Sequence, residues 1–408
     1  MTGLLENKRI ILGVTGSIAA YKAAELASKL HQQGALVDVI LTEKACEFIS
    51  PLTFQSVTGR KAYVEKDLWG SEGHVTHIAL GRAAELVVIA PASANTLAKL
   101  ANGIADNLLT VTTLASHCPL IIAPAMDGGM YSHPATQENI ERIKKRGAIF
   151  IGPASGHLAS NLVGPGRMSE PIEIINSLRY LISRDGPLAG KKVVVTAGGT
   201  QEPIDPVRIV TNRSSGKQGY ALAQSALDAG ADVILISSPT ALETPYGAEL
   251  YCASTAAEMY RAVMEEVRDA DFLLMAAAVA DFHPIHFSVH KIKKDEGLPQ
   301  IYMEETVDIL QEVAKEKAKT GYPRWTIGFA AESQELIKNA YEKLKNKALD
   351  LIVANDISVA DSGFSVDTNR VTFLFANGTQ ESLPTLSKRE VADRVLSHVI
   401  QWLKNTAE

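Results

Sequence analysis

The sequence has few cysteines and no recognisable export signal. Its 408 residues include only Cys46, Cys118 and Cys252, and none of the three lies near another along the chain. A set this sparse and odd in number does not form the disulfide framework of a small secreted protein. The opening segment MTGLLENKR also lacks the apolar core of a signal peptide. We therefore expect a cytoplasmic protein with reduced thiols.

Long hydrophobic runs and an excess of positive charge are missing as well. The longest apolar stretches, Leu86–Ala92 and Phe272–Ala280, are far shorter than the ~20 residues of a membrane-spanning helix. They are typical of buried strands in a parallel sheet. The formal net charge of -6 argues against a general nucleic-acid-binding protein, because such proteins usually present a basic surface. We expect small molecules as partners, and neither a membrane nor a nucleic acid.

The chain does contain one local sequence pattern that occurs twice. A strand, a glycine-rich turn, a helix and a second strand are predicted over Ile10–Leu41, and again over Lys192–Ser237. The two copies predict an α/β fold with two doubly wound, Rossmann-like domains, each with a mostly parallel sheet. Between them, Arg184–Gly190 is polar and broken by glycine and proline. We place the boundary there, giving domains over residues 1–188 and 189–408.

In the first half, small and polar residues follow two predicted strands. Gly13–Ala19 follows the first strand, and Ala90–Thr96 follows the buried strand that begins at Leu86. In an open parallel sheet these turns lie at the carboxyl edge, where backbone amides and a helix N-terminus can hold an anion. The same residues could serve packing or helix capping alone, and Ser93 or Asn95 would suit an N-cap.

The second half is dense in groups that can bind anions. Thr211–Gly219 opens a predicted helix, so its amides can hold a phosphate, and Arg208 can clamp a carboxylate or phosphate with two hydrogen bonds. Small residues follow the strand at Met275, and Asp281 after them could bind a ribose or a metal ion. The lysines of Lys291–Lys294 fit either a solvated face or a triphosphate ligand. A structured loop with ordinary caps is the alternative.

An ordered set of motifs in the first half resembles the flavoprotein family of cysteine decarboxylases, and most closely the N-terminal half of the bifunctional coenzyme A biosynthesis proteins. The resemblance spans nearly all of residues 7–185 and rests on GVTGSIAAYK from Gly13, His77–Gly81, Ala90–Thr96, Asp106–Leu109, Pro124–Met126 and Gly164–Met168. It implies a flavodoxin-like domain that binds FMN and decarboxylates 4'-phosphopantothenoylcysteine to 4'-phosphopantetheine. His77 would be the catalytic histidine. The implied FMN-binding positions are Gly16, Ser17, Ala19, Thr42, Ser93, Ala94, Asn95, Thr96 and Ala125.

Two positions depart from the family pattern. Asp127 stands where the family has an asparagine that contacts the substrate carboxylate, and Ser160 stands where it has a cysteine that donates a proton. An ionised Asp127 would repel a carboxylate unless it faces another group, and a hydroxyl is a far weaker acid than a thiol. We expect a working variant of the decarboxylase. The alternative is an active ligase fused to a flavin domain that stops at the enethiol or is only binding or regulatory.

The second half resembles the phosphopantothenate–cysteine ligase half of the same family over about residues 189–400. The resemblance implies activation of 4'-phosphopantothenate by CTP with Mg²⁺ and displacement of CMP from an acyl-cytidylate by cysteine. Lys291 and Arg208 would neutralise the meeting anions, and Asn212 would position the acyl intermediate. The implied nucleotide-binding residues are Met275, Ala276, Ala277, Asp281, Lys291, Phe329, Lys343 and Lys347, with Asp281 as the Mg²⁺ ligand. The family also implies a homo-oligomer, with trimeric flavin domains and dimeric ligase domains that could form a dodecamer.

Overall fold

A computed structural model describes residues 3–69, 75–158, 160–293, 300–332, 335–356 and 366–407. Contacts between Cα atoms divide the chain into two compact units, and the division falls between Arg179 and Tyr180. This point lies inside helix α8 (Pro171–Ser183), so the predicted boundary at residue 188 lies in the segment that follows the helix. No described helix is long and apolar enough to cross a membrane.

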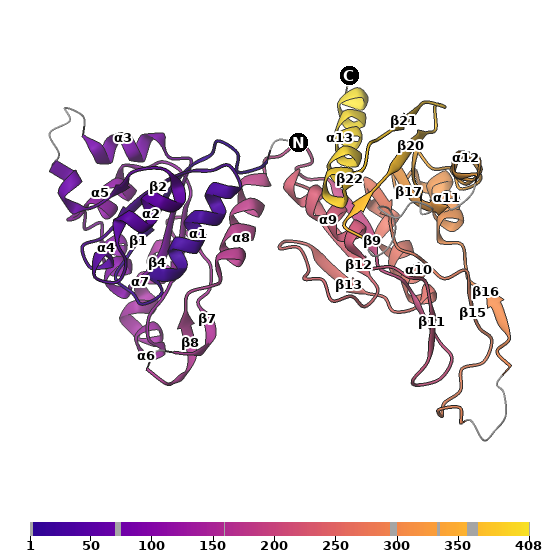
Figure 1. The fold of residues 1–408 in the computed structure, drawn as a ribbon, viewed down its shortest axis with the longest axis horizontal. Coiled ribbons are helices and arrows are strands. Elements are labelled where there is room, and N and C mark those ends of the chain that lie inside the picture. Colours follow the sequence, from indigo (N-terminus) through magenta and orange to yellow (C-terminus); the bar gives the residue numbers. More distant parts are fainter. Residues whose placement is uncertain are drawn as a thin grey trace. The chain divides into compact units, whose positions relative to one another are not determined.

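The first unit is built on a six-stranded sheet in which every neighbouring pair is parallel (Figure 1). The strand order is β3-β2-β1-β4-β5-β6, so the order reverses between β1 and β4. The strands are β1 (Arg9–Val14), β2 (Leu36–Leu41), β3 (Ala62–Tyr63), β4 (Leu86–Ala92), β5 (Leu120–Pro124) and β6 (Ile149–Phe150). All residues of β4 are buried, which confirms the buried strand predicted over Leu86–Ala92.

Helices connect these strands in a regular alternation. In α1, the buried residues Ala23, Leu26, Ala27 and Leu30 share one face, as their spacing predicts. The helices are α1 (Ala20–Gln32), α2 (Pro51–Thr58), α3 (Thr76–Ala83), α4 (Ala94–Asn102), α5 (Leu108–Ala115), α6 (Gly128–Ser132) and α7 (Pro134–Lys144). An antiparallel hairpin, β7 (Ala154–His157) with β8 (Val163–Arg167), precedes α8.

The second unit is built on an eight-stranded sheet with the order β13-β12-β9-β14-β17-β18-β20-β21. The pairs from β13 to β18 are parallel, and β20 and β21 continue the sheet in antiparallel fashion. The strands are β9 (Lys192–Ala197), β12 (Asp232–Ser237), β13 (Glu249–Cys252), β14 (Phe272–Met275), β17 (Trp325–Glu332), β18 (Leu351–Asp356), β20 (Val371–Phe375) and β21 (Gln380–Ser382). The prediction of two doubly wound α/β domains with mostly parallel sheets is confirmed.

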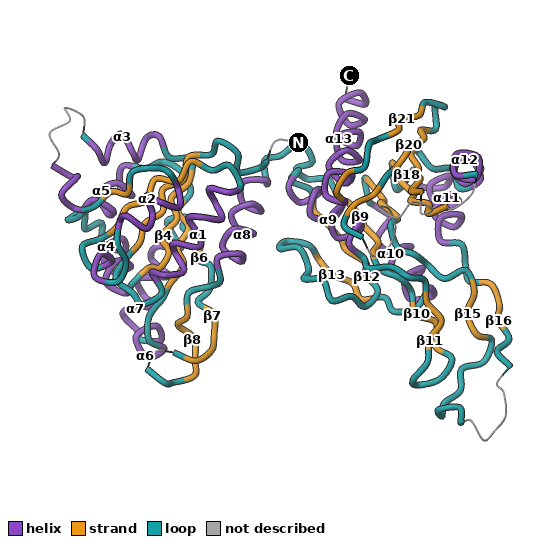
Figure 2. The backbone as a smooth tube through the Cα atoms, in the orientation of Figure 1, coloured by secondary structure: helices purple, strands orange, loops and turns teal. Residues whose placement is uncertain are grey.

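The helices and short strand pairs of the second unit complete its fold (Figure 2). The helices are α9 (Lys217–Asp228), α10 (Ala256–Glu266), α11 (Ile309–Thr320), α12 (Leu336–Asn346) and α13 (Lys388–Ala407). Three antiparallel pairs lie outside the main sheet: β10 (Gln201–Pro203) with β11 (Ile209–Thr211), β15 (Phe282–Pro284) with β16 (Met303–Glu305), and β19 (Thr368–Asn369) with β22 (Leu386–Ser387).

The apolar stretch Phe272–Ala280 is not a strand along its whole length. β14 ends at Met275, and the alanines that follow bond to a side chain at the end of β9 and to the turn after it instead of continuing a strand ladder. The amide of Ala277 donates to Thr196 Oγ1 over 3.1 Å, and the amide of Ala278 donates to the Gly198 carbonyl over 2.8 Å. The chain therefore leaves the sheet plane here and lines the carboxyl edge.

Candidate active sites

In the first unit, Thr15 joins the turns that follow β1 and β4. Its hydroxyl donates to the Pro91 carbonyl over 2.7 Å and accepts from the Ser93 amide over 2.9 Å. Thr15 is 1% exposed, so both hydrogen bonds are shielded from water. The two turns therefore meet at the point where the strand order reverses, which is where open α/β sheets bind ligands.

Gly16 lets the turn after β1 approach the segment after β2. A Cβ atom at Gly16 would lie 2.7 Å from the Cβ of Lys44, closer than real side chains come. Thr42 lies in the same segment, and its amide donates to the Val14 carbonyl over 3.0 Å. The amide of Ala125, after β5, donates to the Ala92 carbonyl over 3.0 Å. The predicted FMN positions therefore lie on four neighbouring turns at one edge of the sheet.

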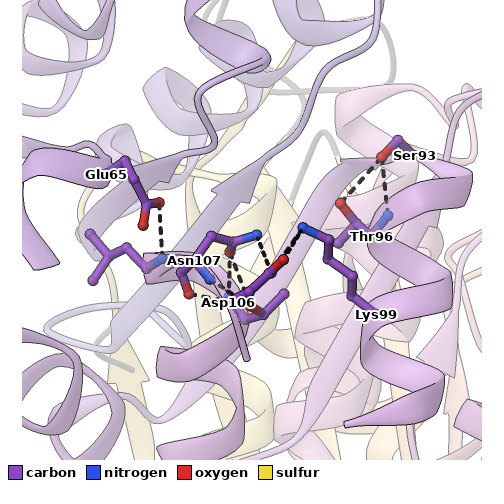
Figure 3. A network of polar contacts seen from close by, with 8 residues as sticks. Glu65, Ser93, Thr96, Lys99, Asp106 and Asn107 are labelled. Atoms are coloured by element: carbon purple, nitrogen blue, oxygen red, sulfur yellow. Dashed lines mark hydrogen bonds and ion pairs between the residues drawn. The ribbon is translucent and has the colours of Figure 1, made fainter. Parts of the chain in front are cut away.

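Side chains at this edge also cap the helices that start there (Figure 3). Ser93 Oγ accepts from the Thr96 amide over 3.3 Å and lies 3.2 Å from its hydroxyl, so Ser93 is the N-cap of α4. Asn107 caps α5 in the same way. Lys99 Nζ donates to Asp106 Oδ1 over 2.8 Å and to Oδ2 over 2.9 Å. This ion pair joins the end of α4 to the segment just before α5. The capping interpretation of Ser93 is confirmed, whereas Asn95 is exposed and lies within α4.

His77 lies in the first turn of α3 and is half-buried. Its Nδ1 atom is buried and has no hydrogen-bond partner among the described residues. A buried ring nitrogen normally has a hydrogen-bond partner, so an unsatisfied one is unusual for a histidine with a purely structural role. The geometry suits the predicted role of a catalytic histidine.

Asp127 and Ser160, the two departures from the family pattern, touch one another. Ser160 donates from Oγ to Asp127 Oδ2 over 2.6 Å, and the Gly129 amide donates to Asp127 Oδ1 over 2.9 Å. The Ser160 hydroxyl, followed by the Gly129 amide, holds the pKa of the Asp127 carboxyl below its usual range. Asp127 is therefore a carboxylate at neutral pH, and it faces a hydroxyl donor.

In the second unit, a cavity of about 880 Å³ opens at the carboxyl edge of the sheet. Its floor is formed by Ala276–Ala278, whose small side chains leave backbone exposed to the cavity. The side-chain amide of Asn212 donates to the Val279 carbonyl over 2.9 Å, which fixes the loop before α9 against this floor. Of the predicted nucleotide-site residues, those that line the cavity are Asn212, Met275, Ala276, Ala277, Asp281, Phe329, Lys343 and Lys347.

Close packing holds α9 against β9 beside the cavity. A Cβ atom at Gly219 would lie 2.5 Å from the Cβ of Ala197 and 2.7 Å from the Thr196 carbonyl oxygen. The start of α9 therefore reaches the sheet only because residue 219 is a glycine. Its first turn, with Ser214–Gly216 before it, presents amides toward the cavity.

Charged groups of both signs face the cavity. Lys347 Nζ lies 3.0 Å from Asp308 Oδ2, so a carboxylate partly compensates its charge. Asp281 lines the cavity with an exposed side chain. No group of three or more potential His, Cys, Asp or Glu metal ligands occurs among the described residues. A single carboxylate beside a polyphosphate can still hold Mg²⁺, because this ion commonly keeps water and phosphate ligands.

Arg208 and Lys291 do not line this cavity. Arg208 Nη1 lies 2.5 Å from Asp205 Oδ2 and donates to the Ile292 carbonyl over 3.2 Å, so the structure places Arg208 beside the loop of Lys291. Burial alone would raise the pKa of Asp205. The amides of Val207, Arg208 and Ile292, together with the guanidinium, nevertheless hold this pKa below its usual value. Lys294, the last lysine of the predicted cluster, lies outside the described residues.

Comparisons with known proteins cover both units. Residues 188–403 match the family model "DNA/pantothenate metabolism flavoprotein C-terminal domain", and residues 2–183 match the model "Flavoprotein". The coenzyme A biosynthesis bifunctional protein CoaBC of Bacillus subtilis (strain 168) is 45% identical over 408 residues, covering 99% of this chain and 100% of that protein. The chain belongs to the family of bifunctional coenzyme A biosynthesis proteins.

Further members of the CoaBC family are also similar to this chain. The CoaBC protein of Vibrio cholerae serotype O1 is 44% identical over 398 residues, covering 97% of this chain and 98% of that protein. The crystal structure of the C-terminal domain of a CoaBC protein is 38% identical with a TM-score of 0.46, covering 54% of this chain and 100% of that one. The predicted bifunctional enzyme of coenzyme A biosynthesis, with ligase and decarboxylase activities, is confirmed by membership in the CoaBC family.

Several residues at these CoaBC sites were not predicted from the sequence. Thr15 was part of a recognised motif, but its role in joining two turns was not foreseen. The cavity is also lined by Lys217, Asn369 and Lys388. Along the chain, Lys217 lies more than 150 residues before the other two. Lys217 follows the Ser-Ser-Gly motif directly, so its position was a usable signal. Nothing in the local sequence of Asn369 or Lys388 indicates a site, because only the fold brings them to the cavity.

Proposed function

We propose that residues 189–408 join cysteine to 4'-phosphopantothenate with CTP, and that residues 1–188 decarboxylate the product to 4'-phosphopantetheine. The observation that supports the first step most directly is the cavity, which gathers eight of the predicted ligase residues at one sheet edge. The second step is supported by the two turns that meet at the switch point of the first sheet and by the neighbouring turns after β2 and β5 on the same edge. The family membership of the whole chain favours this pair of reactions over a flavin domain that only binds or stops at the enethiol.

In the ligase site, the chain must bring a carboxylate against a nucleotide phosphate. Two anions repel, so cations and backbone amides have to neutralise them before an acyl-cytidylate can form. Lys343 and Lys347 line the cavity beside Phe329, and we assign these residues to the nucleotide. Asn212, fixed to the Val279 carbonyl, is placed to position the acyl group, and Asp281 is our candidate Mg²⁺ ligand.

Arg208 and Lys291 need a separate account because neither lines the cavity. Asp205 couples them by binding both the Arg208 guanidinium and the amide next to Lys291. We assign this pair to a cationic contact with the substrates that lies outside the lining of the cavity. The cavity within one chain would then hold the nucleotide, and the pair would complete the charge neutralisation.

The first unit fits a flavin mononucleotide at the carboxyl edge. Gly16 leaves the turn after β1 without a side chain at the point of closest approach, and the start of α1 favours a negative charge. Bound FMN would accept a hydride from the substrate and later return it. The chain's own residues would hold and orient the flavin through Ser17, Ala19, Thr42, Ser93–Thr96 and Ala125.

His77, Asp127 and Ser160 would act on the substrate in this unit. The buried Nδ1 atom of His77 is placed to exchange a proton. Asp127 orients Ser160 by accepting a 2.6 Å hydrogen bond from its hydroxyl. We propose that the pair occupies the place of the family's proton donor and holds a polar group there.

One incubation tests the proposed function. The purified full chain is mixed with 4'-phosphopantothenate, cysteine, CTP and Mg²⁺, and the products are identified by mass spectrometry. We expect 4'-phosphopantetheine. Accumulated 4'-phosphopantothenoylcysteine or its enethiol would support the ligase alone and contradict the decarboxylase assignment. Replacing CTP by ATP, and chelating Mg²⁺, tests the nucleotide and metal assignments separately.

We also propose a homo-oligomer in a reducing, cytoplasmic compartment. The antiparallel pair of β15 and β16 carries exposed apolar side chains, with Phe282 at 51% and Met303 at 37% exposure, and Tyr302 just before β16 is 65% exposed. A surface of this kind suits contact with another copy. The three cysteines form no disulfide with one another, which suits reduced thiols. Trimeric flavin domains, dimeric ligase domains and a dodecamer remain predictions that light scattering can test.

A further inference from the structure

One wall of the ligase cavity carries two lysines that the proposed function does not use. Lys217 is the first residue of α9, and Lys388 is the first residue of α13. The two helices pack side by side, and Ser225 Oγ of α9 donates to Asp393 Oδ1 of α13 over 2.7 Å (Figure 1). Both lysines line the cavity, although they are far apart along the chain.

Lys388 is held rigidly at this wall. Its amide donates to the Asp367 carbonyl over 3.0 Å, and its own carbonyl accepts from Gln218 Nε2 over 3.2 Å. Gln218 Oε1 in turn accepts from Asn369 Nδ2 over 3.0 Å. Gln218 and Asn369 also line the cavity, so amide groups flank the lysines there. These hydrogen bonds hold the backbone at the start of α13 and the side chains of Gln218 and Asn369 in place.

The charge at this wall is unfavourable for stability by itself. Lys388 is only 7% exposed, and its pKa is lowered first by burial and next by the charge of Lys217, with Asp367 opposing both. Lys217 Nζ lies 2.6 Å from Asp367 Oδ1, but that carboxylate is 82% exposed and points into water. Each lysine also begins a helix, where the macrodipole favours a negative charge rather than a positive one.

Two ammonium groups at two helix starts, beside a cavity, would be stabilised by an incoming anion. A phosphoryl group suits the place, because it carries up to two charges and accepts several hydrogen bonds at once. The amides before and within the first turn of α9 add donors on the same side.

We propose that Lys217 and Lys388, with Gln218 and Asn369, form a phosphoryl-binding subsite of the ligase cavity. The inference rests on the proposed function, in which both the nucleotide and the acid carry phosphate. Either substrate could supply the phosphoryl group, since the chemistry recognised is the same. Lys388 would be a binding residue for that group, and Asn369 a positioning residue that acts through Gln218.

The test is steady-state ligation by the full chain carrying Lys388→Met, Lys388→Arg or Lys217→Met. Loss of a charge-assisted contact should raise the KM of one substrate by about tenfold to a hundredfold for Lys388→Met. Lys388→Arg should recover most of this loss, because it restores the cation. A raised KM for CTP assigns the subsite to the nucleotide, and a raised KM for 4'-phosphopantothenate assigns it to the acid. Asn369→Ala should raise the same KM by a smaller factor.

Lys404→Met is the matched control, since Lys404 is an exposed lysine on the same helix. It should leave both KM values and the melting temperature unchanged. If Lys388→Met folds poorly, two other measurements test the subsite. One is the KM of Lys217→Met, since Lys217 is half-exposed, and the other is calorimetric binding of inorganic pyrophosphate to the unmodified chain. Unchanged KM values in both methionine variants would overturn the subsite. Absence of any ligation by the unmodified chain would instead overturn the proposed function.

Discussion

The two units begin in the same way and then hold their ligands differently. In the first unit, α1 starts soon after β1, and the turn between them, which we assign to FMN, closely approaches the segment after β2 at Gly16. In the second unit, the long segment between β9 and α9 carries the β10–β11 hairpin, and the site is a cavity lined by several lysines. A short turn suits a cofactor that stays bound, whereas an open cavity lined by lysines suits substrates that enter, react and leave.

The comparison implies that each site can be disabled alone. Replacing His77 by alanine should lower decarboxylation by about a hundredfold to ten-thousandfold, the range for loss of a general acid or base. Ligation should continue, so 4'-phosphopantothenoylcysteine should accumulate in the coupled assay. His117→Gln, an exposed histidine of the same unit, serves as control. Equal loss of both activities would show that the units are not independent.

Gly219→Ala should do the opposite, impairing ligation while leaving decarboxylation in place. The added Cβ would lie 2.5 Å from Ala197 Cβ and 2.7 Å from a backbone oxygen, so the start of α9 has to move away from the sheet. We expect the second unit to lose about 1–3 kcal/mol of stability, and ligation to fall with it. Thermal unfolding should show the loss, while flavin binding and decarboxylation of supplied 4'-phosphopantothenoylcysteine should persist. Retained ligation at full rate would contradict the packing argument.

Ser160→Ala tests whether decarboxylation in the first unit needs the Asp127 carboxylate. Ser160 is the main cause of the lowered pKa of Asp127, so its loss should move that pKa upward. Asp127 would then be protonated at a higher pH as the solution is acidified. If the carboxylate is needed, the acid limb of the decarboxylation pH profile should shift to higher pH. Ser155→Ala, on the same hairpin, should leave the profile unchanged. If the acid limb of the pH profile does not shift in Ser160→Ala, the ionisation of Asp127 does not control decarboxylation.

Asp205→Asn should have the smallest effect. The lowered pKa of Asp205 means that its carboxylate contributes stability that is complete above its ordinary pKa and is lost as the pH falls through the folded-state pKa. The asparagine variant should therefore show a weaker acid dependence of unfolding than the unmodified chain. Ligation should change only modestly, because Arg208 loses an ionic partner but keeps its place in the loop. Unfolding at several acidic pH values measures the difference.

The sequence predicted the local pieces of the fold well. The strands at Ile10 and Lys192 and the helices after them follow from apolar spacing and glycine stops, which act over a few residues. The strand predicted through Ala280 is too long, because hydrogen bonds from Thr196 and Gly198 draw the chain out of the sheet after Met275. Alternation of small apolar residues cannot reveal such a departure.

The sites were predictable where their residues stand together in one motif. Asn212 and Met275–Ala277 were found in this way, and the cavity includes them. The contact between Asp127 and Ser160 was not foreseen, because the β7–β8 hairpin creates it across 33 positions of the chain. Arg208 and the loop of Lys291 come together outside the lining of the cavity, and no local sequence pattern encodes this separation.

The antiparallel continuation of the second sheet has a consequence for shortened forms of the chain. β20 begins at Val371 and α13 begins at Lys388, after the predicted nucleotide-binding residues, of which Lys347 is the last. A premature stop or a proteolytic cut between Lys347 and Val371 would leave those residues in the chain while removing Val371 and Lys388 from the lining of the cavity. Such a truncated gene product would look like a ligase in a sequence search and fail as one in the cell.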